Sequence, residues 1–398
     1  MRIIYLGTIS PHPGGAAIAG SQLLGGLAAR GHAVQAVAGT TEPIEERERR
    51  DRMDMAGVTT FRYAIRQNVV EGASLTLGAL RSIRPGLRSA VRRAIAEGCP
   101  EIVVSGRSDF APDALVVARA LRVPMVQMEH RRDGGALCAD DPLCAQAVRH
   151  AYRRADVVVL VARHLRAAHA WIPRAVVIPN AVESDRFRPM PRDPELAACL
   201  GIPPDTVVVL HASNLKIVKR AQDIVAAIPA VLERVPGTRF VFLGDGSDRE
   251  AIAAAVAAAG LTEHVHLVGW QPREAMPRWY ALADIVVMPS TTEAMSLVGL
   301  EATAAGRVLV ASDIPAFRET VTDGEDGLLV PVMDVPALAD RIATAAADPG
   351  VRARIGAAAR ARVARRSMDG FLAEWETVLA QAVATSRADR ANAQEPTA

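Results

Sequence analysis

The sequence has few cysteines, and none is spaced for metal binding. Its 398 residues include four, Cys99, Cys138, Cys144 and Cys199. They form no C-x-x-C pair and have no histidine pair beside them, which argues against a structural zinc site. Cys138 and Cys144 are close enough in sequence to approach one another in a loop, but free thiols in a reducing cytoplasm are the state we expect.

Long apolar runs and a large net charge are also absent. No run reaches the roughly 18 residues needed to span a bilayer. The opening residues, MRIIYLG, lack the long apolar segment and cleavage site of a signal peptide and are typical of a first strand. The formal net charge of +2 gives no reason to expect nucleic acid as a partner. We therefore expect a cytoplasmic protein without a transmembrane segment.

Strand and helix signals alternate along most of the chain. The expected strands, each next to a helix, are 2–6, 33–38, 101–105, 124–128, 156–161, 206–211, 239–243, 264–268, 284–288, 308–311 and 327–330. Strands that alternate with helices favour parallel sheets, so the fold class is α/β. The glycine-rich turn after the first strand is not G-x-G-x-x-G, so a dinucleotide site is not indicated.

The domain organisation follows from a proline-marked join at Val176–Asn180. We expect an N-terminal domain over residues 1–175 and a C-terminal domain over 176–367. A final segment, 368–398, should be a helix with a polar tail from Ser386. Phe371, Trp375 and Leu379 share one face of that helix, which predicts that it crosses back and packs on the first domain.

Two glutamates after the strand 284–288 are the most informative feature. Glu293 lies in the loop at the carboxyl end of that strand, and Glu301 lies on the helix expected from Ser296 to Ala305. Ligands bind at this edge of an open α/β sheet. A loop carboxylate can accept hydrogen bonds from sugar hydroxyls, and a helix carboxylate can hold a vicinal diol. A helix N-terminus favours an anion, so the segment offers places for a sugar, a diphosphate and a ribose, which are parts of a sugar nucleotide. Incidental glutamates on a solvated helix face are the alternative.

The surrounding segment, 289–312, reads PSTTEAMSLVGLEATAAGRVLVAS. It resembles the E-x7-E signature of family-4 retaining glycosyltransferases. The sequence departs from that family by Ala294-Met295-Ser296 in place of Gly-Phe-Gly and by Arg307-Val308 in place of x-Pro. The first departure bears on which donor sugar fits. The resemblance implies the GT-B fold, in which two Rossmann-like domains face each other across a cleft.

A second resemblance lies in the loop Ala212–Arg220. It is similar to the Ser-Asn-Phe-Arg-x-Val-Lys-Arg loop of N-acetylglucosaminyl malate synthases, a branch of family 4. The match implies that Lys216 and Lys219 contact the donor diphosphate. Negative charge grows on that leaving group as the glycosidic bond breaks, and fixed cations in a dry pocket stabilise it. Without the resemblance, such a basic cluster is more typical of solvated surface.

The resemblance also implies roles for other residues. His130 would contact the donor sugar in the transition state without acting as a general base, although a lone histidine is more often structural. Gly269 and Arg273 would flank the nucleotide base. The expected catalytic residues are His130, Lys219 and Glu293; the donor-binding residues are Gly15, Asn214, Lys216, Lys219, Gly269, Arg273, Glu293, Ser296, Leu297 and Glu301; and the acceptor-binding residues are Gly14, Arg107 and Arg131.

The sequence contains no D-x-D triplet, which metal-dependent sugar transferases use to hold a divalent ion. Lysines and a helix N-terminus would replace it, so we expect no metal and no cofactor. The implied function is retaining transfer of a hexose from a UDP-sugar, such as UDP-GlcNAc, to a hydroxyl of a small polar acceptor. A UDP-sugar epimerase or hydrolase of the same fold, and a non-catalytic sugar-nucleotide-binding partner subunit, are the alternatives. We count a second copy of the chain, in a homodimer, among the candidate partners.

Overall fold

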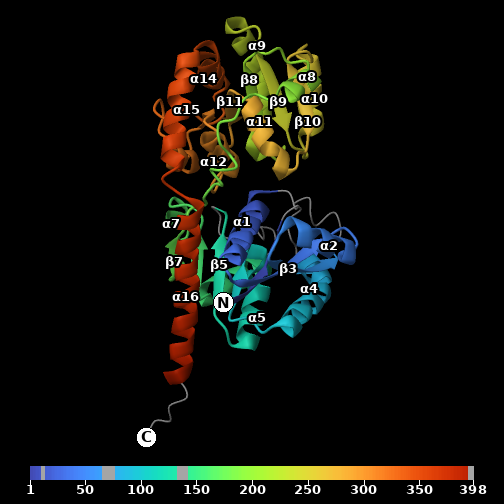
Figure 1. Cartoon of the computed structure of the whole chain (residues 1–398), viewed down its shortest axis with the longest axis vertical. Helices are drawn as coiled ribbons and strands as arrows, with labels where there is room; N and C mark the ends of the chain where they lie inside the picture. Colours follow the sequence, from blue (N-terminus) through green and yellow to red (C-terminus); the bar gives the residue numbers. More distant parts are fainter. Residues whose placement is uncertain (10–13, 65–76, 132–141, 393–398) are drawn as a thin grey trace. The chain divides into compact units, whose positions relative to one another are not determined.

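The computed structural model describes residues 1–9, 14–64, 77–131 and 142–392 (Figure 1). It divides into two compact units. Unit 1 contains residues 1–179 and 369–398, and unit 2 contains residues 180–368. Each unit is built on one parallel sheet with its own helices, so the predicted α/β class with two Rossmann-like halves is confirmed.

The sheet of unit 1 has seven parallel strands in the order β3-β2-β1-β4-β5-β6-β7. Its strands are β1 (Arg2–Leu6), β2 (Ala33–Thr40), β3 (Val58–Ala64), β4 (Ile102–Ser105), β5 (Met125–Glu129), β6 (Val157–Leu160) and β7 (Ala175–Val177). Its helices are α1 (Gly15–Ala29), α2 (Ile44–Asp54), α4 (Leu77–Glu97), η1 (Ser108–Phe110), α5 (Ala111–Leu121), α6 (Pro142–Arg154), α7 (Leu165–Ala168) and α16 (Met368–Asn392).

The sheet of unit 2 has six parallel strands in the order β10-β9-β8-β11-β12-β13. Its strands are β8 (Val208–Ala212), β9 (Arg239–Leu243), β10 (Val265–Gly269), β11 (Ile285–Met288), β12 (Val308–Ser312) and β13 (Leu328–Val330). Its helices are α8 (Pro194–Cys199), η3 (Ile217–Lys219), α9 (Ala221–Arg234), α10 (Arg249–Ala258), η4 (Arg273–Ala275), α11 (Met276–Leu282), α12 (Leu297–Ala304), α13 (Pro315–Thr320), α14 (Val335–Ala347) and α15 (Pro349–Val363).

Strands near the middle of both sheets are buried, and in unit 1 β4 and β5 have no exposed residue. In unit 2, β8, β11 and β12 have no exposed residue. Such strands are continuous apolar runs because helices cover both faces of a parallel sheet. One large core cluster joins these strands to apolar side chains of α9, α10 and α14. This packing fixes the carboxyl ends of the strands, from which the loops of the candidate site leave.

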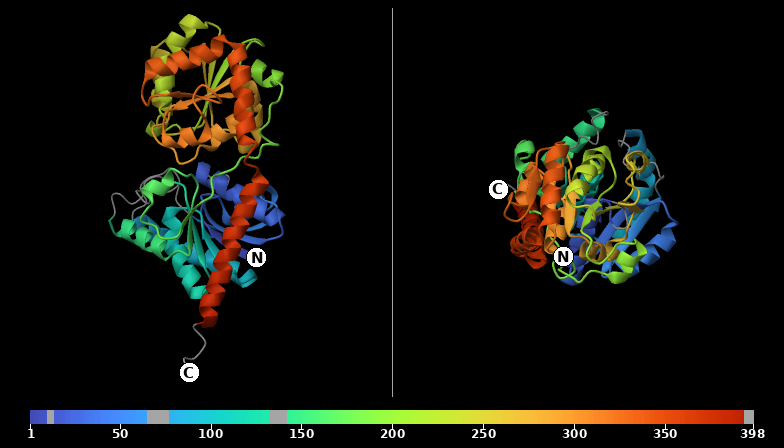
Figure 2. Two further views of the ribbon diagram at one scale, coloured as in Figure 1. Left: turned by 90° about the vertical axis from the view of Figure 1, so that its left-hand side faces the viewer. Right: turned by 90° about the horizontal axis from the view of Figure 1, so that it is seen from above.

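The C-terminal helix α16 returns to unit 1, as predicted (Figures 1 and 2). Its Phe371, Trp375 and Leu379 are all buried. A Cβ at Gly26 of α1 would lie 2.6 Å from a terminal methyl carbon of Leu372, so α16 packs closely against α1 at this glycine. None of the helices in the described part of the chain combines the length and the apolar content that a bilayer span requires.

Three details differ from the sequence predictions. The helix α16 continues past Ser386 to Asn392, and Arg387 donates to Glu101 of unit 1 at 2.6 Å, so the polar segment does not leave the helix at Ser386 as predicted. Strands β3 and β7 are not among the predicted strands. Cys99 and Cys199 are free, but Cys144 is disulfide-bonded, which contradicts the free thiol expected there. Cys138 lies outside the described residues.

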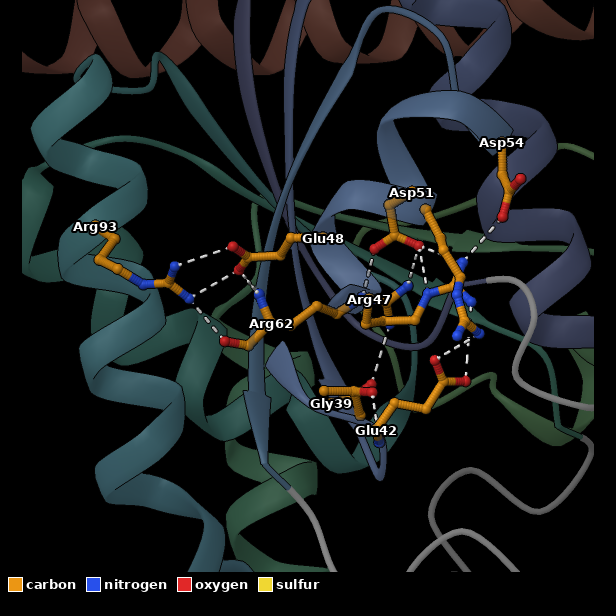
Figure 3. A network of polar contacts seen from close by, with 10 residues as sticks. Gly39, Glu42, Arg47, Glu48, Asp51, Asp54, Arg62 and Arg93 are labelled. Carbon is orange, nitrogen blue, oxygen red and sulfur yellow. Dashed lines mark hydrogen bonds and ion pairs between the residues drawn. The ribbon is translucent and has the colours of Figure 1, made fainter. Parts of the chain in front are cut away.

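Nine of the eleven residues of helix α2 are charged. The helix contacts the sheet through hydrogen bonds and ion pairs between these side chains and strand β3. Figure 3 shows Asp51 of α2 between two arginines. Arg47 donates to Asp51 from Nε at 2.8 Å and from Nη2 at 2.7 Å, and Arg62 of β3 donates from Nε at 2.6 Å. Asp51 is fully buried. Arg93 of α4 and Glu48 of α2 extend the network to the backbone of β3.

Candidate functional site

The candidate site residues fall into two groups, one in each unit. Each group lies at a carboxyl edge of a sheet, beside the point where the strand order reverses. In unit 1 that point lies between β1 and β4, and in unit 2 it lies between β8 and β11. Loops diverge there and leave a crevice, which is where open α/β sheets bind ligands. Each group is described within its own unit.

In unit 2, the reversal point brings Lys219 and Glu293 together. Lys219 belongs to η3, which follows β8, and Glu293 follows β11. The Nζ of Lys219 donates to Oε1 of Glu293 at 2.6 Å, and the hydroxyl of Ser290 donates to the same oxygen at 2.9 Å. Both long side chains are only slightly exposed, at 18% and 11%. A partly desolvated cation and anion therefore meet where the two loops diverge.

The loop that carries Lys219 is held by close backbone packing. The N–H of Leu215 donates to Asp245, and the N–H of Ser213 donates to Leu243. A Cβ at Gly244 would lie 1.7 Å from the carbonyl oxygen of Ser213, and a Cβ at Gly246 would lie 2.4 Å from that of Leu215. Only glycine permits this approach, so the segment 244–246 fixes the path of the loop 213–219.

A buried histidine, His211, contacts the start of the same loop. One ring nitrogen of His211, Nδ1, lies 2.8 Å from the carbonyl oxygen of Val287, and the other, Nε2, lies 2.8 Å from the hydroxyl of Ser213. Burial lowers the pKa of His211 to about 4, so the ring is neutral at pH 7. A neutral ring that donates from Nδ1 accepts the Ser213 hydroxyl proton at Nε2. His211 thereby joins the ends of β8 and β11.

The N-terminus of α12 lies directly after Glu293. Ser296 caps this helix by accepting the N–H of Gly299 at 3.1 Å, and both Ser296 and Leu297 are buried. The first turn of a helix presents N–H groups that no carbonyl of the helix can accept. Asn214 is exposed and Lys216 is half-buried. The predicted diphosphate residues thus share one loop, and a helix N-terminus follows Glu293.

Glu301 is fixed by partners from outside its helix. Its side chain is buried, Arg273 donates to Oε1 at 2.6 Å, and Tyr280 donates to Oε2 at 2.9 Å. Arg273 also donates to Glu183 at 2.8 Å. Burial raises the pKa of Glu301, although Arg273 and Tyr280 oppose that shift.

Gly269 ends β10, two strands away from the reversal point. Its φ of +87° lies in the left-handed region that favours glycine. The side chain of Arg273 is occupied by two carboxylates. A contact between Arg273 and the base stays a prediction.

In unit 1, Gly14 and Gly15 mark the start of α1. Gly14 has a φ of +123°, and its carbonyl oxygen accepts the N–H groups of Ala17 and Ile18. Gly15 is the first residue of the helix, with open space around the position of a Cβ. The positive φ explains a glycine at 14, and local packing does not demand one at 15.

His130 and Arg107 follow the neighbouring strands β5 and β4. Burial lowers the pKa of His130 to about 4, and the charge of Arg107 adds to that shift, so the ring is neutral. The Nε2 of His130 is buried and has no partner within the described residues. Arg107 donates to Asp109 at 3.0 Å. A neutral ring with an uncommitted nitrogen fits a hydrogen-bond role better than that of a cation.

The backbone of Arg131 is held on both sides. Its N–H donates to the buried carboxylate of Glu129 at 2.6 Å, and its carbonyl oxygen lies 2.8 Å from Nε2 of His169. Tyr152 donates its hydroxyl to the other oxygen of Glu129. The predicted acceptor residue thus stands on a rigid support, next to His130.

Sequence reasoning missed the residues that support the two groups: His211, Ser290, Tyr280 and Glu183 in unit 2, and Glu129 in unit 1. One signal was available for the loop 213–219: Lys216 and Lys219 are the only lysines in the chain, and every other basic side chain apart from histidine is an arginine. In the part of the chain that the structure describes, no three His, Cys, Asp or Glu side chains are grouped to hold a metal ion.

Comparisons with known proteins agree with this architecture. Residues 13–186 match the model described as "Glycosyltransferase Family 4", and residues 193–362 match that of "Glycosyl transferases group 1". The chain is 32% identical over 295 residues to a GDP-mannose-dependent alpha-(1-6)-phosphatidylinositol monomannoside mannosyltransferase of Mycolicibacterium smegmatis. The aligned residues cover 69% of this chain and 75% of that relative. This chain belongs to glycosyltransferase family 4.

Two further proteins are similar to this glycosyltransferase. A D-inositol 3-phosphate glycosyltransferase of Xylanimonas cellulosilytica is 34% identical over 222 residues, covering 54% of this chain and 52% of that protein. The crystal structure of Anabaena HepE (Alr3699) in complex with UDP-glucose superposes with a TM-score of 0.76 at 20% identity, covering 96% of this chain and all of that one. At that identity the superposition shows the fold alone. The N-acetylglucosaminyl malate synthase branch is not confirmed.

Proposed function

We propose that this glycosyltransferase moves a sugar from a UDP-sugar, with UDP-GlcNAc as the first candidate, to a hydroxyl of a small polar acceptor with retention of configuration. The observation that carries the proposal is the contact between Lys219 and Glu293 at the strand reversal of unit 2. A cation there suits the diphosphate, and an adjacent carboxylate suits sugar hydroxyls. In the reaction, the acceptor oxygen bonds to the anomeric carbon as the bond to the β-phosphate breaks. The leaving phosphate oxygen takes the acceptor proton on the same face.

The remaining donor contacts follow from the same geometry. The N-terminus of α12, with Ser296 and Leu297, would bind diphosphate oxygens together with Lys216 and Asn214. Glu301 would accept the ribose hydroxyls, and Gly269 would offer its backbone to the base. In unit 1, His130 would hydrogen-bond to the sugar, while Gly15 would contact donor phosphate. Gly14, Arg107 and Arg131 would bind the acceptor.

A GDP-sugar is the alternative to the proposed UDP-sugar donor. The relative from Mycolicibacterium smegmatis uses GDP-mannose and acts on a phosphatidylinositol mannoside, according to its name. The HepE structure contains UDP-glucose. The loop 212–220 is similar to that of N-acetylglucosaminyl malate synthases. A thermal-shift screen of UDP- and GDP-sugars decides between them, because a ligand that binds the native state raises its melting temperature. Stabilisation by GDP-mannose alone would reject the UDP proposal.

Product analysis separates the transferase from the alternatives considered at the outset. An epimerase or hydrolase would consume donor without acceptor, and a non-catalytic subunit would bind donor and release it unchanged. We expect turnover to require an acceptor hydroxyl. The small polar class is suggested by the inositol phosphate named for the Xylanimonas relative. A panel of inositol phosphates, hydroxy acids and amino sugars is therefore the first acceptor set to assay.

The product is expected to keep the anomeric configuration of the donor. Inversion needs a general base on the far side of the anomeric carbon. The first domain would have to supply that base, and the candidate proposed there is His130, whose low pKa makes it a weak base. An α-linked donor should therefore give an α-linked product, which the anomeric coupling in the proton NMR spectrum of fresh product reports. A β-linked product would refute both the retaining reaction and the role given to His130.

Catalysis is expected to proceed without a divalent ion. The two lysines of the loop 213–219 and the α12 N-terminus would supply the positive potential that a metal gives to other sugar transferases. Activity in EDTA should stay within about twofold of the untreated enzyme, and added magnesium should change little. Loss of activity in EDTA that magnesium or manganese restores would show that these groups do not suffice.

A further inference from the structure

The buried carboxylate of Glu301 is held by two donors from different elements. Arg273 of η4 occupies Oε1, and Tyr280 of α11 occupies Oε2. A carboxylate offers about four lone-pair positions, so each oxygen keeps one for a ligand. Glu301 is only 3% exposed. A buried charge of this kind is costly unless it is paired and hydrogen-bonded.

Arg273 is itself immobilised by its surroundings. It donates to Glu183 at 2.8 Å in addition to Glu301. Its guanidinium carbon lies 5.1 Å from the ring centre of Phe187, and that ring packs edge-on against Tyr280 at 5.8 Å. The side chain of Arg273 is 14% exposed. The planar guanidinium can hold the carboxylates of Glu301 and Glu183 with two different nitrogens at once, which the single ammonium of a flexible lysine would do less well.

We propose that Arg273 and Tyr280 are positioning residues that orient the Glu301 carboxylate toward the two ribose hydroxyls of the donor nucleotide. The inference rests on the proposed donor site and extends it to two residues that act on the ribose through Glu301. Each of the two donors takes one lone pair of Glu301, which leaves the other pair of each oxygen for the 2′- and 3′-hydroxyls. The same arrangement serves UDP and GDP, because both carry the same ribose.

The charges around Glu301 give the proposal a pH signature. Burial raises the pKa of Glu301, and the charge and hydrogen bonds of Arg273 and Tyr280 oppose it. Glu183, which pairs with Arg273 and lies 3.8 Å from Arg186, raises the pKa of Glu301 further. Without Arg273, the pKa of Glu301 should rise, and a protonated carboxyl would lose acceptor capacity. Nucleotide binding should then recover as the pH increases.

The test compares two ligands that differ only in the ribose hydroxyls. Calorimetry measures binding of UDP and of 2′,3′-dideoxyuridine diphosphate to wild type, Arg273→Gln, Arg273→Lys and Tyr280→Phe. In Arg273→Gln, we expect UDP to bind about 10–100-fold more weakly at pH 7, since bonds to a charged group are lost. The dideoxy ligand should bind as it does to wild type, so the preference for UDP collapses. Tyr280→Phe should lose about 3–10-fold in the same pattern.

Arg273→Lys keeps the charge and should retain part of the preference for UDP. Raising the pH from 7 to 9 should restore UDP binding to Arg273→Gln and leave wild type almost unchanged. Glu301→Gln serves as the reference, because it should lose the preference at every pH. Arg278→Gln is the matched control, since Arg278 pairs with Asp193 at the surface. It should bind both ligands as wild type does.

The outcomes separate this inference from the proposed function. If both ligands weaken equally in Arg273→Gln and in Tyr280→Phe, the two residues only support the fold, and the inference is wrong. Unchanged UDP binding in both variants would reject it as well. If wild type prefers GDP, the same comparison with dideoxyguanosine diphosphate applies. Failure of wild type to bind either diphosphate would overturn the donor site itself and this inference with it.

Discussion

Lys219→Ala is expected to lower kcat by about 10²–10³-fold, the usual effect of removing a preorganised charge at a developing anion. Lys219 is largely desolvated and contacts Glu293 at 2.6 Å, so its charge lies in a low-dielectric place at the strand reversal. Breaking of the glycosidic bond adds negative charge to the diphosphate, and a fixed cation acts on that change. KM for the donor should move much less, because the charge grows only in the transition state.

The measurement is steady-state kinetics of Lys219→Ala, with circular dichroism to check the fold. Arg220→Gln is the matched control, because it removes a neighbouring cation whose partner is Asp223. Its kcat should stay near that of wild type. If kcat of Lys219→Ala fell only a few-fold, the diphosphate would have to be stabilised elsewhere.

Chemical modification of the lysines tests the same donor site independently of the kinetics. Lys216 and Lys219 are the only lysines of the chain, so an amine-directed reagent can modify those two side chains and the N-terminus alone. UDP should protect both lysines, and peptide mass spectrometry can measure the protection of each.

The sequence predicts the donor loops well because their motifs are contiguous. Glu293 and Glu301 are eight positions apart on a strand–loop–helix segment, so hydrophobic periodicity alone places one at a strand end and the other on a helix. The partners of Glu301 could not be predicted from the sequence, because they are not contiguous with it. Arg273 and Tyr280 lie on other elements, and a contact between side chains that far apart in sequence has no local signature. The family resemblance pointed to Arg273, but toward the base instead of Glu301.

Strand β3 shows where periodicity fails. Its residues Val58–Ala64 include Arg62, and a charged residue inside a short run argues against a buried strand. Arg62 is nevertheless 3% exposed, because Asp51 of α2 accepts its guanidinium. The strand and the polar helix therefore stabilise each other through these contacts. The same pairing explains why α2, with nine charged residues of eleven, can pack against a sheet.

Asp51→Asn is accordingly expected to destabilise unit 1 by about 3–5 kcal/mol, the typical effect of removing one partner from a buried ion pair. The substitution keeps the shape of the side chain but leaves Arg47 and Arg62 buried without their shared anion. Urea titration with hydrogen exchange of β3 peptides measures this in unit 1 separately from unit 2. Glu46→Gln on the same helix is the control, because Glu46 pairs with Arg50 at the surface and exposed pairs contribute little.

The pH dependence gives the same prediction a second measurement. Burial alone would raise the pKa of Asp51, but the hydrogen bonds and charges of Arg62 and Arg47 outweigh burial and lower it. A lowered pKa stabilises the folded state above the pKa of the unfolded chain, about 3.9, and that stabilisation is lost as the pH falls through the folded value. The difference between wild type and Asp51→Asn should thus be full at pH 6–7 and shrink below about pH 4. A difference that stays constant down to pH 3 would mean that the carboxylate charge is not what holds α2 on β3.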